Sequence, residues 1–226
     1  MKKIKSIKKT LVFIYHTIRL LLIPSKSLYS LLYVGNRLSE SKVARKATDE
    51  LLQSEEIQEQ VKTNYGYTPL DLETLKDLPE ESFGKVLYEF MTSQNLDVYP
   101  LNEELKPTPA VYLRERRRKI HDYLHVVLGY GTDLLGEAEV NAFTARQTGM
   151  PISYLIIIGV LLRTMVKQPL EFHSLIDRLR HAWKRGGMSE NLFVFPWEDV
   201  LDQPLEEVRI GFFIHKYQQI NLKKAA

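Results

Sequence analysis

Apolar residues recur at intervals of three and four along most of the 226-residue chain, which is the spacing of one face of an α-helix. Phe83, Val86, Leu87, Phe90 and Met91 form a representative run. Prolines, glycines and small polar residues separate such runs, and the sequence shows no internal repeat and no series of alternating strands. The pattern predicts an all-α fold.

Start and stop signals place the expected helices. Residues 28–63 are rich in helix-forming residues, with a break expected near Gly35-Asn36. Residues 152–162 would also fit a buried strand, but a proline start and a helical exit favour a helix, and about eleven apolar residues are too few to span a bilayer. Further helices are expected after Pro79, over 110–128, over 170–186 with Gly186-Gly187 as its end, and over 205–214. Another is expected to be capped by Thr132 or Asp133 and to run to about Thr148, with Gly149 at its end.

The first 39 residues differ from the rest in charge. They contain eight basic residues and no Asp or Glu, whereas residues 40–226 hold the other 23 basic residues and all 28 acidic ones, a net charge of −5. A basic body that binds nucleic acid is therefore not supported. We divide the chain into a basic amphipathic N-terminal segment, 1–39, and a single helical domain, 40–226.

The N-terminal segment carries one apolar helical stripe, made of Ile4, Ile7, Leu11, Ile14, Ile18 and Leu21. Its apolar run is interrupted by His16 and Arg19 and falls short of the ~20 residues that span a bilayer. Three interpretations remain open: a helix lying on an anionic membrane surface, a helix packed on the body or on a partner, and a cleaved targeting peptide.

The stretch from His121 to Glu137 carries the candidate chemistry. His121 and His125 are four residues apart, so on a helix their Cβ atoms lie ~5–6 Å apart on one face and both imidazoles can reach one ion. Asp122 could be a further metal ligand, or it could orient one of the imidazoles through the ring nitrogen that does not face the metal. Because the chain has no cysteine, any metal would be held by histidine and carboxylate.

Glu137 could join this site only if the chain turns back. In one unbroken helix it would lie ~18 Å along the axis from His125. Gly129 and Gly131 can supply the required turn. The alternative is an ordinary helical hairpin with surface histidines, since an acidic residue early in a helix is favoured by the helix dipole alone.

Four arginines precede the histidine pair: Arg114, Arg116, Arg117 and Arg118. On their own they indicate a solvated helix face, and they could also meet a phosphate or carboxylate head group. A metalloprotease is disfavoured because such enzymes use a glutamate base after the first histidine, and Asp122 is one methylene shorter.

The stretch resembles the coenzyme Q biosynthesis protein 4 family, marked by His-Asp-x-x-His, eleven residues, and Glu. His121, Asp122, His125 and Glu137 match this motif without a departure. Leu78–Gly84 is also similar to a family segment, with Glu81 where glycine is usual. The similarity covers about residues 65–214 and includes Gly136-Glu137, Gln147–Gly149, Trp197-Glu198 and Pro204–Arg209.

The resemblance implies an all-α protein on a membrane face that binds a prenylated quinone precursor, forms homodimers and works with other quinone-biosynthesis proteins. The implied activity is oxidative decarboxylation of a polyprenylated hydroxybenzoate ring, in which a hydroxyl replaces the carboxyl. The alternative is a non-catalytic scaffold that binds isoprenoid lipid. The implied location is peripheral, on the cytoplasmic face in a bacterium or the matrix face in a mitochondrion.

His121, Asp122, His125 and Glu137 are therefore the expected metal and catalytic residues. Zn²⁺ is the expected ion; Fe²⁺ also fits two histidines and a carboxylate, and Mg²⁺ would fit a weakly held ion. An isoprenoid tail would need an apolar channel. Its candidate lining is one stripe of the helix at 152–162, namely Tyr154, Leu155, Ile158 and Leu162, which could equally pack in the core or at a dimer contact.

Overall fold

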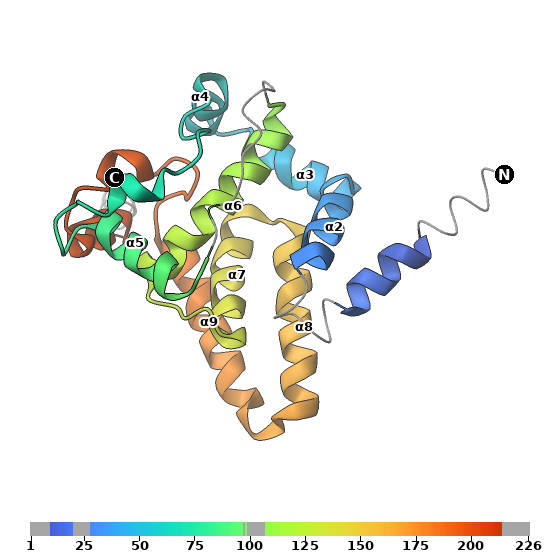
Figure 1. Cartoon of the computed structure of the whole chain (residues 1–226). Helices are drawn as coiled ribbons and strands as arrows, with labels where there is room; N and C mark the ends of the chain where they lie inside the picture. Colours follow the sequence, from blue (N-terminus) through green and yellow to red (C-terminus); the bar gives the residue numbers. More distant parts are fainter. Residues whose placement is uncertain (1–9, 20–27, 97, 99–106, 214–226) are drawn as a thin grey trace, which may run out of the picture.

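The computed structural model describes residues 10–19, 28–96, 98 and 107–213 (Figure 1). Within these ranges the fold is all-α, as expected, and the one β-type contact is an isolated bridge between Ser82 and Pro204. The helices are α2 (Leu28–Ser39), α3 (Lys42–Leu51), α4 (Glu55–Thr63), η2 (Leu72–Leu75), α5 (Phe83–Ser93), α6 (Pro109–Leu128), α7 (Leu134–Thr148), α8 (Pro151–Lys167), η3 (Pro169–Glu171), α9 (Phe172–Met188) and η4 (Trp197–Val200). Residues 10–19 and 205–213 are also helical.

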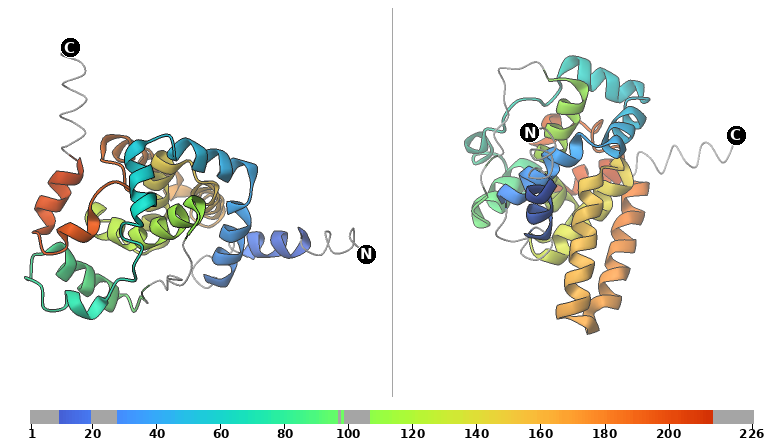
Figure 2. Two further views of the ribbon diagram at one scale, coloured as in Figure 1. Left: turned by 90° about the horizontal axis from the view of Figure 1, so that it is seen from above. Right: turned by 90° about the vertical axis from the view of Figure 1, so that its right-hand side faces the viewer.

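Helices α6 and α7 lie at the centre of the molecule. The main apolar cluster surrounds α6 and includes Tyr123 of that helix, Phe83 of α5, and Trp197 and Phe212 from the C-terminal part. Helices α8 and α9 run side by side as a long hairpin that extends beyond the body (Figures 1 and 2). α7 therefore has α6 on one side and the hairpin on the other.

Helix α9 approaches α7 closely at a glycine. A Cβ on Gly186 would lie 2.6 Å from the Phe143 carbonyl oxygen, nearer than packed atoms tolerate. The expectation that Gly186-Gly187 ends the helix is wrong, since α9 continues to Met188. Gly186 serves helix packing instead of helix termination.

Gly186→Ala is expected to lower the free energy of unfolding by about 1–3 kcal/mol, because the added methyl must push α9 away from α7. Gly187→Ala is the matched control, since its Cβ would meet only the Arg146 side chain at 3.3 Å. Urea unfolding of both variants measures the difference. Equal stability of the two variants would contradict the close approach.

A buried ion cluster fixes α6 to η4 and to the loop that follows α4. Arg116 is fully buried and binds both oxygens of Glu198 through its two terminal nitrogens. The Lys119 Nζ donates to the same carboxylate at 2.9 Å and to the carbonyl oxygens of Gly66 and Thr68. The interpretation of Arg116 as part of a solvated face is therefore wrong.

Two other expectations concern the N-terminal part. The prediction of a break near Gly35-Asn36 is wrong, because α2 runs through both residues to Ser39. The next helix, α3, begins at Lys42 with Ser41 as its N-cap. Of the apolar stripe, Leu11, Ile14 and Ile18 lie in the described helix and are about half exposed, and the other members lie outside the described residues. No helix within the described ranges is long and apolar enough to cross a membrane.

Candidate metal centre

The required turn between the two halves of the candidate site is present. α6 ends at Leu128, and Gly129 follows in the left-handed conformation at φ 70°. The amides of Gly129 and Tyr130 both donate to the His125 carbonyl oxygen, at 3.0 and 3.1 Å. Asp133 then caps α7 by accepting from the Gly136 amide at 2.7 Å. The prediction of a turn at the glycines, followed by a capped helix, is confirmed.

Gly136 holds this turn against the first turn of α7. A Cβ at Gly136 would lie 2.0 Å from the Gly131 carbonyl oxygen, and two more backbone atoms of Gly131 lie within 3 Å of that position. No side chain fits there without displacing the backbone that precedes Glu137.

Gly136→Ala is therefore expected to move Glu137 away from the two histidines. Metal binding should weaken by roughly 10-fold or more, because the loss of residues that position metal ligands typically has an effect of this size. Gly131→Ala is the control, because its nearest neighbour would be Asp133 at 3.9 Å. Titration of each folded variant with Zn²⁺ measures the effect. Wild-type affinity in Gly136→Ala would show that the turn does not position Glu137.

The turn brings His121, His125 and Glu137 together. The Nε2 atoms of the histidines lie 3.2 Å apart. Each also lies 3.3 Å from a Glu137 oxygen, His121 from Oε2 and His125 from Oε1. The His125 side chain is 1 % exposed, whereas those of His121 and Glu137 are 26 % and 36 % exposed. The group is thus buried on the His125 side and open on the other.

The His125 ring is fixed by its surroundings. Its Nδ1 lies 3.1 Å from the Tyr130 carbonyl oxygen. Because a carbonyl only accepts, Nδ1 carries the proton and Nε2 presents a lone pair to His121 and Glu137. Phe90 stacks on the ring at 5.8 Å between centroids. This is the arrangement by which metal-binding histidines are usually oriented.

The spacing of these atoms fits a tetrahedrally coordinated ion. Ligands about 2.0–2.1 Å from zinc in a tetrahedron are separated by roughly 3.3 Å. The observed separations of 3.2, 3.3 and 3.3 Å are of this size, with each histidine facing a different Glu137 oxygen. One ligand atom from each of the three residues lies within 4.8 Å of the other two. Three protein ligands with an exposed fourth side are typical of catalytic zinc sites, whereas structural sites are closed by four protein ligands.

The electrostatics of the group favour a cation. Burial raises the pKa of Glu137, but the two imidazoles outweigh burial and hold that pKa well below its usual range. Burial lowers the pKa of His121, but Glu137 and Asp122 outweigh it and leave that pKa raised. A negative carboxylate facing two nitrogen ligands supplies the charge and the lone pairs that a divalent ion needs.

Asp122 lies beside this group and is not part of it. The three residues whose ligand atoms lie within 4.8 Å of one another are His121, His125 and Glu137. Burial raises the pKa of Asp122, and the two histidines oppose this effect. Its proximity to both imidazoles keeps the supporting role open, while the ligand role has no matching contact among the described residues.

Two contributors were not expected from the sequence. The Tyr130 carbonyl orients His125, and Phe90 of α5 stacks on it from a distant part of the chain. The Gly-Tyr-Gly turn could have indicated the Tyr130 contact, because a chain reversal at that point places the carbonyl groups of the turn near the end of α6. Nothing in the local sequence indicates the contact of Phe90.

A family model described as Coenzyme Q (ubiquinone) biosynthesis protein Coq4 matches residues 2–218. The chain belongs to this family. Among curated members, the mitochondrial ubiquinone biosynthesis protein COQ4 homolog of Mus musculus is 36% identical over 152 residues, which are 62% of this chain and 53% of that protein. The mitochondrial COQ4 protein of Scheffersomyces stipitis is 28% identical over 165 residues, 70% of this chain and 49% of that protein.

The fold has a counterpart of known structure. The crystal structure of a candidate ubiquinone biosynthesis protein from Nostoc punctiforme superposes with a TM-score of 0.77, covering 92% of this chain and 98% of that one, at 23% identity. At this identity the likeness shows the fold. The chain spans about half the length of the curated Coq4 relatives that it matches.

Proposed function

We propose that this Coq4 chain catalyses metal-dependent oxidative decarboxylation of a polyprenylated hydroxybenzoate ring. The observation that carries the proposal is the convergence of the His121, His125 and Glu137 ligand atoms around one open side. Membership of a ubiquinone-biosynthesis family supplies the substrate class. Replacement of the ring carboxyl by hydroxyl is a two-electron oxidation of the ring. The bond from the ring to the carboxyl breaks as CO₂ leaves, water supplies the hydroxyl, and dioxygen accepts the two electrons and two protons as hydrogen peroxide.

Each residue has a separate task in this proposal. A bound Zn²⁺ would supply Lewis-acid stabilisation of charge on the phenol and carboxylate oxygens, and Fe²⁺ in its place would add oxygen chemistry. His125 is the fixed anchor, because Tyr130 and Phe90 orient its ring. His121 and Glu137 are partly exposed and border the side where a ring can enter.

An assay of carboxyl-labelled substrate with a short prenyl tail tests the proposal. Purified protein under air should release labelled CO₂ and form the hydroxylated ring. Glu137→Ala should lose this release by roughly 10²-fold or more, because loss of a ligand costs at least as much as loss of its support. Glu207→Ala, at an exposed position of the C-terminal helix, is the control. Release by Glu137→Ala at the wild-type rate would contradict the proposal.

Membrane association, homodimers and binding of the isoprenoid tail belong to the same proposal. The exposed side of α8 supports them, since Tyr154, Ile158 and Leu162 are 39 %, 49 % and 47 % exposed on one stripe. Leu155, on the same stripe, is half-buried and packs near Val34 and Ile152. Apolar side chains in such a row are typical of contact with lipid or protein.

The second candidate is a non-catalytic scaffold that binds isoprenoid lipid within a quinone-biosynthesis assembly. The same exposed row on α8 favours it, because that surface could serve binding without any reaction. In that case the metal would be structural. The open side of the centre favours the enzyme, since a structural ion is normally enclosed by protein ligands.

A further inference from the structure

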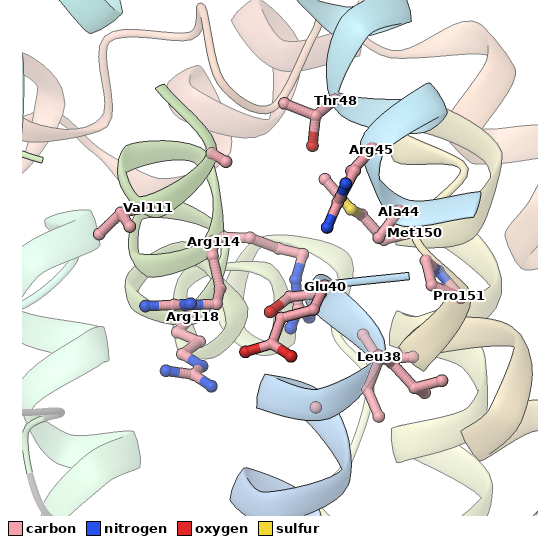
Figure 3. Close-up of a pocket in the computed structure, with 15 residues that line it drawn as sticks. Leu38, Glu40, Ala44, Arg45, Thr48, Val111, Arg114, Arg118, Met150 and Pro151 are labelled. Atoms are coloured by element: carbon pink, nitrogen blue, oxygen red, sulfur yellow. The ribbon is translucent and has the colours of Figure 1, made fainter. Parts of the chain in front are cut away.

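A cavity of about 290 Å³ lies between α2, α3, α6 and the start of α8 (Figure 3). Four arginines line it: Arg114, Arg117 and Arg118 of α6, and Arg45 of α3. None of the three proposed metal-binding residues lines it. Its volume is near the lower end of the ~300–1,000 Å³ typical of small-molecule pockets.

The charges around the cavity do not balance. Glu115 pairs with both Arg114 and Arg118, at 2.7 and 3.2 Å. Glu40 also lines the cavity, but it pairs with Arg37 at 2.9 Å. Among the described residues, neither Arg45 nor Arg117 has a carboxylate within ion-pair distance. In the part of the chain that the structure describes, one carboxylate, Glu40, and four arginines line the cavity, which gives an excess of positive charge there.

Of these arginines, Arg117 lies in the surroundings that disfavour its positive charge most. Burial, and then the neighbouring charge of Arg118, lower its pKa to about 10, with Glu115 opposing them only in part, so Arg117 stays protonated at neutral pH. Arg117 is half-buried, and a cation that is partly withdrawn from water without an ion-pair partner is costly. An anion in the cavity would relieve that cost and the repulsion from Arg118.

The other wall of the cavity is apolar and includes the N-terminus of α8. Leu38, Met150 and Ile152 line it. Met150 is the N-cap of α8 and offers no side-chain cap, so the positive end of that 17-residue helix also faces the cavity. In Figure 3, Arg45 reaches from α3 toward the space bordered by Arg114 and Arg118, with Leu38 and Pro151 opposite.

We propose that this cavity binds the phosphate group of an amphiphilic phosphate ester. The guanidinium fork of arginine matches phosphate oxygens in pairs, and the charge excess suits a dianion better than a single carboxylate. The apolar wall then contacts the carbon part of the ligand. The phosphate can come from a membrane phospholipid or from a soluble phosphate ester, and either source uses the same contacts.

Calorimetric titration with a soluble short-chain phosphatidic acid tests this site. The titration uses the full chain carrying His121→Ala, so that phosphate cannot bind through a metal ion. Arg45→Gln together with Arg117→Gln should weaken binding roughly 10-fold or more, since each lost hydrogen bond between charged groups is worth about tenfold. Arg180→Gln is the control, because Arg180 is exposed on α9 and pairs with Asp177.

Two further measurements complete the test. Arg45→Lys with Arg117→Lys keeps the charge and removes the paired fork, and it should bind less tightly than the parent even if the glutamine variant fails to fold.

Sedimentation with phosphatidylcholine vesicles, with and without phosphatidic acid, distinguishes a membrane source of the phosphate from a soluble one. A membrane source predicts a loss of vesicle binding in the variant, and a soluble source predicts a loss with the short-chain probe alone. Equal affinity of parent, glutamine and lysine variants for the probe, or no saturable binding by the parent, would overturn the proposal.

Discussion

The double variant His121→Ala, His125→Ala is expected to retain no zinc or iron after purification, whereas the wild-type chain retains one ion. The variant removes both nitrogen ligands and leaves only Glu137, which on its own cannot hold a transition metal tightly. Elemental analysis of protein purified without chelators measures the difference. This is the largest effect we expect from any substitution in the chain.

A matched control separates this effect from general loss of histidine. His173 and His181 both lie exposed on α9, away from α6 and α7, and His173 pairs with Asp177 at 3.6 Å. His173→Ala with His181→Ala should keep the full metal content. Loss of metal from both double variants, or from neither, would contradict the assignment of His121 and His125 as ligands.

Glu198→Gln is expected to cause the largest loss of stability, about 3–5 kcal/mol, because it leaves the buried charges of Arg116 and Lys119 without their partner. Chemical unfolding measures the loss. Glu207→Gln is the control, since Glu207 is exposed in the helix that begins at residue 205. A loss below about 1 kcal/mol, typical of a surface pair, would show that the cluster does not hold α6 to its loops.

The same cluster predicts how stability depends on pH. Burial raises the pKa of Glu198, but Arg116 and Lys119 outweigh burial and leave that pKa lowered in the folded chain. A lowered folded pKa adds stability above the unfolded value of about 4.3, and this contribution is lost as the pH falls through the folded pKa. The difference in unfolding free energy between wild type and Glu198→Gln should therefore shrink below about pH 4.

The helices and the grouping of His121, His125 and Glu137 were largely predictable from the sequence. Gly129 after α6 and Asp133 before α7 are local signals, and each has the expected role in the structure. Helical spacing alone places His121 beside His125. Glu137 joins this pair once a turn is recognised between His125 and Glu137, and Gly129 and Gly131 indicate that turn.

The failures concern residues whose roles depend on distant partners. Arg116 was indistinguishable in sequence from its three arginine neighbours, because its burial is decided by Glu198, 82 residues away. Gly186 was taken for a helix end, since nothing local shows that the Phe143 carbonyl lies against it. The cavity beside Arg117 likewise exists only because α2, α3 and α8 meet there.

The central claim is that the centre formed by His121, His125 and Glu137 performs chemistry. Its most direct test is to measure CO₂ release from carboxyl-labelled substrate before chelation, after removal of the metal, and after return of Zn²⁺ or Fe²⁺. The account predicts that release stops with the metal removed and returns with one of the two ions. A metal-loaded, folded protein that binds the substrate but releases no CO₂ would contradict it and establish the scaffold.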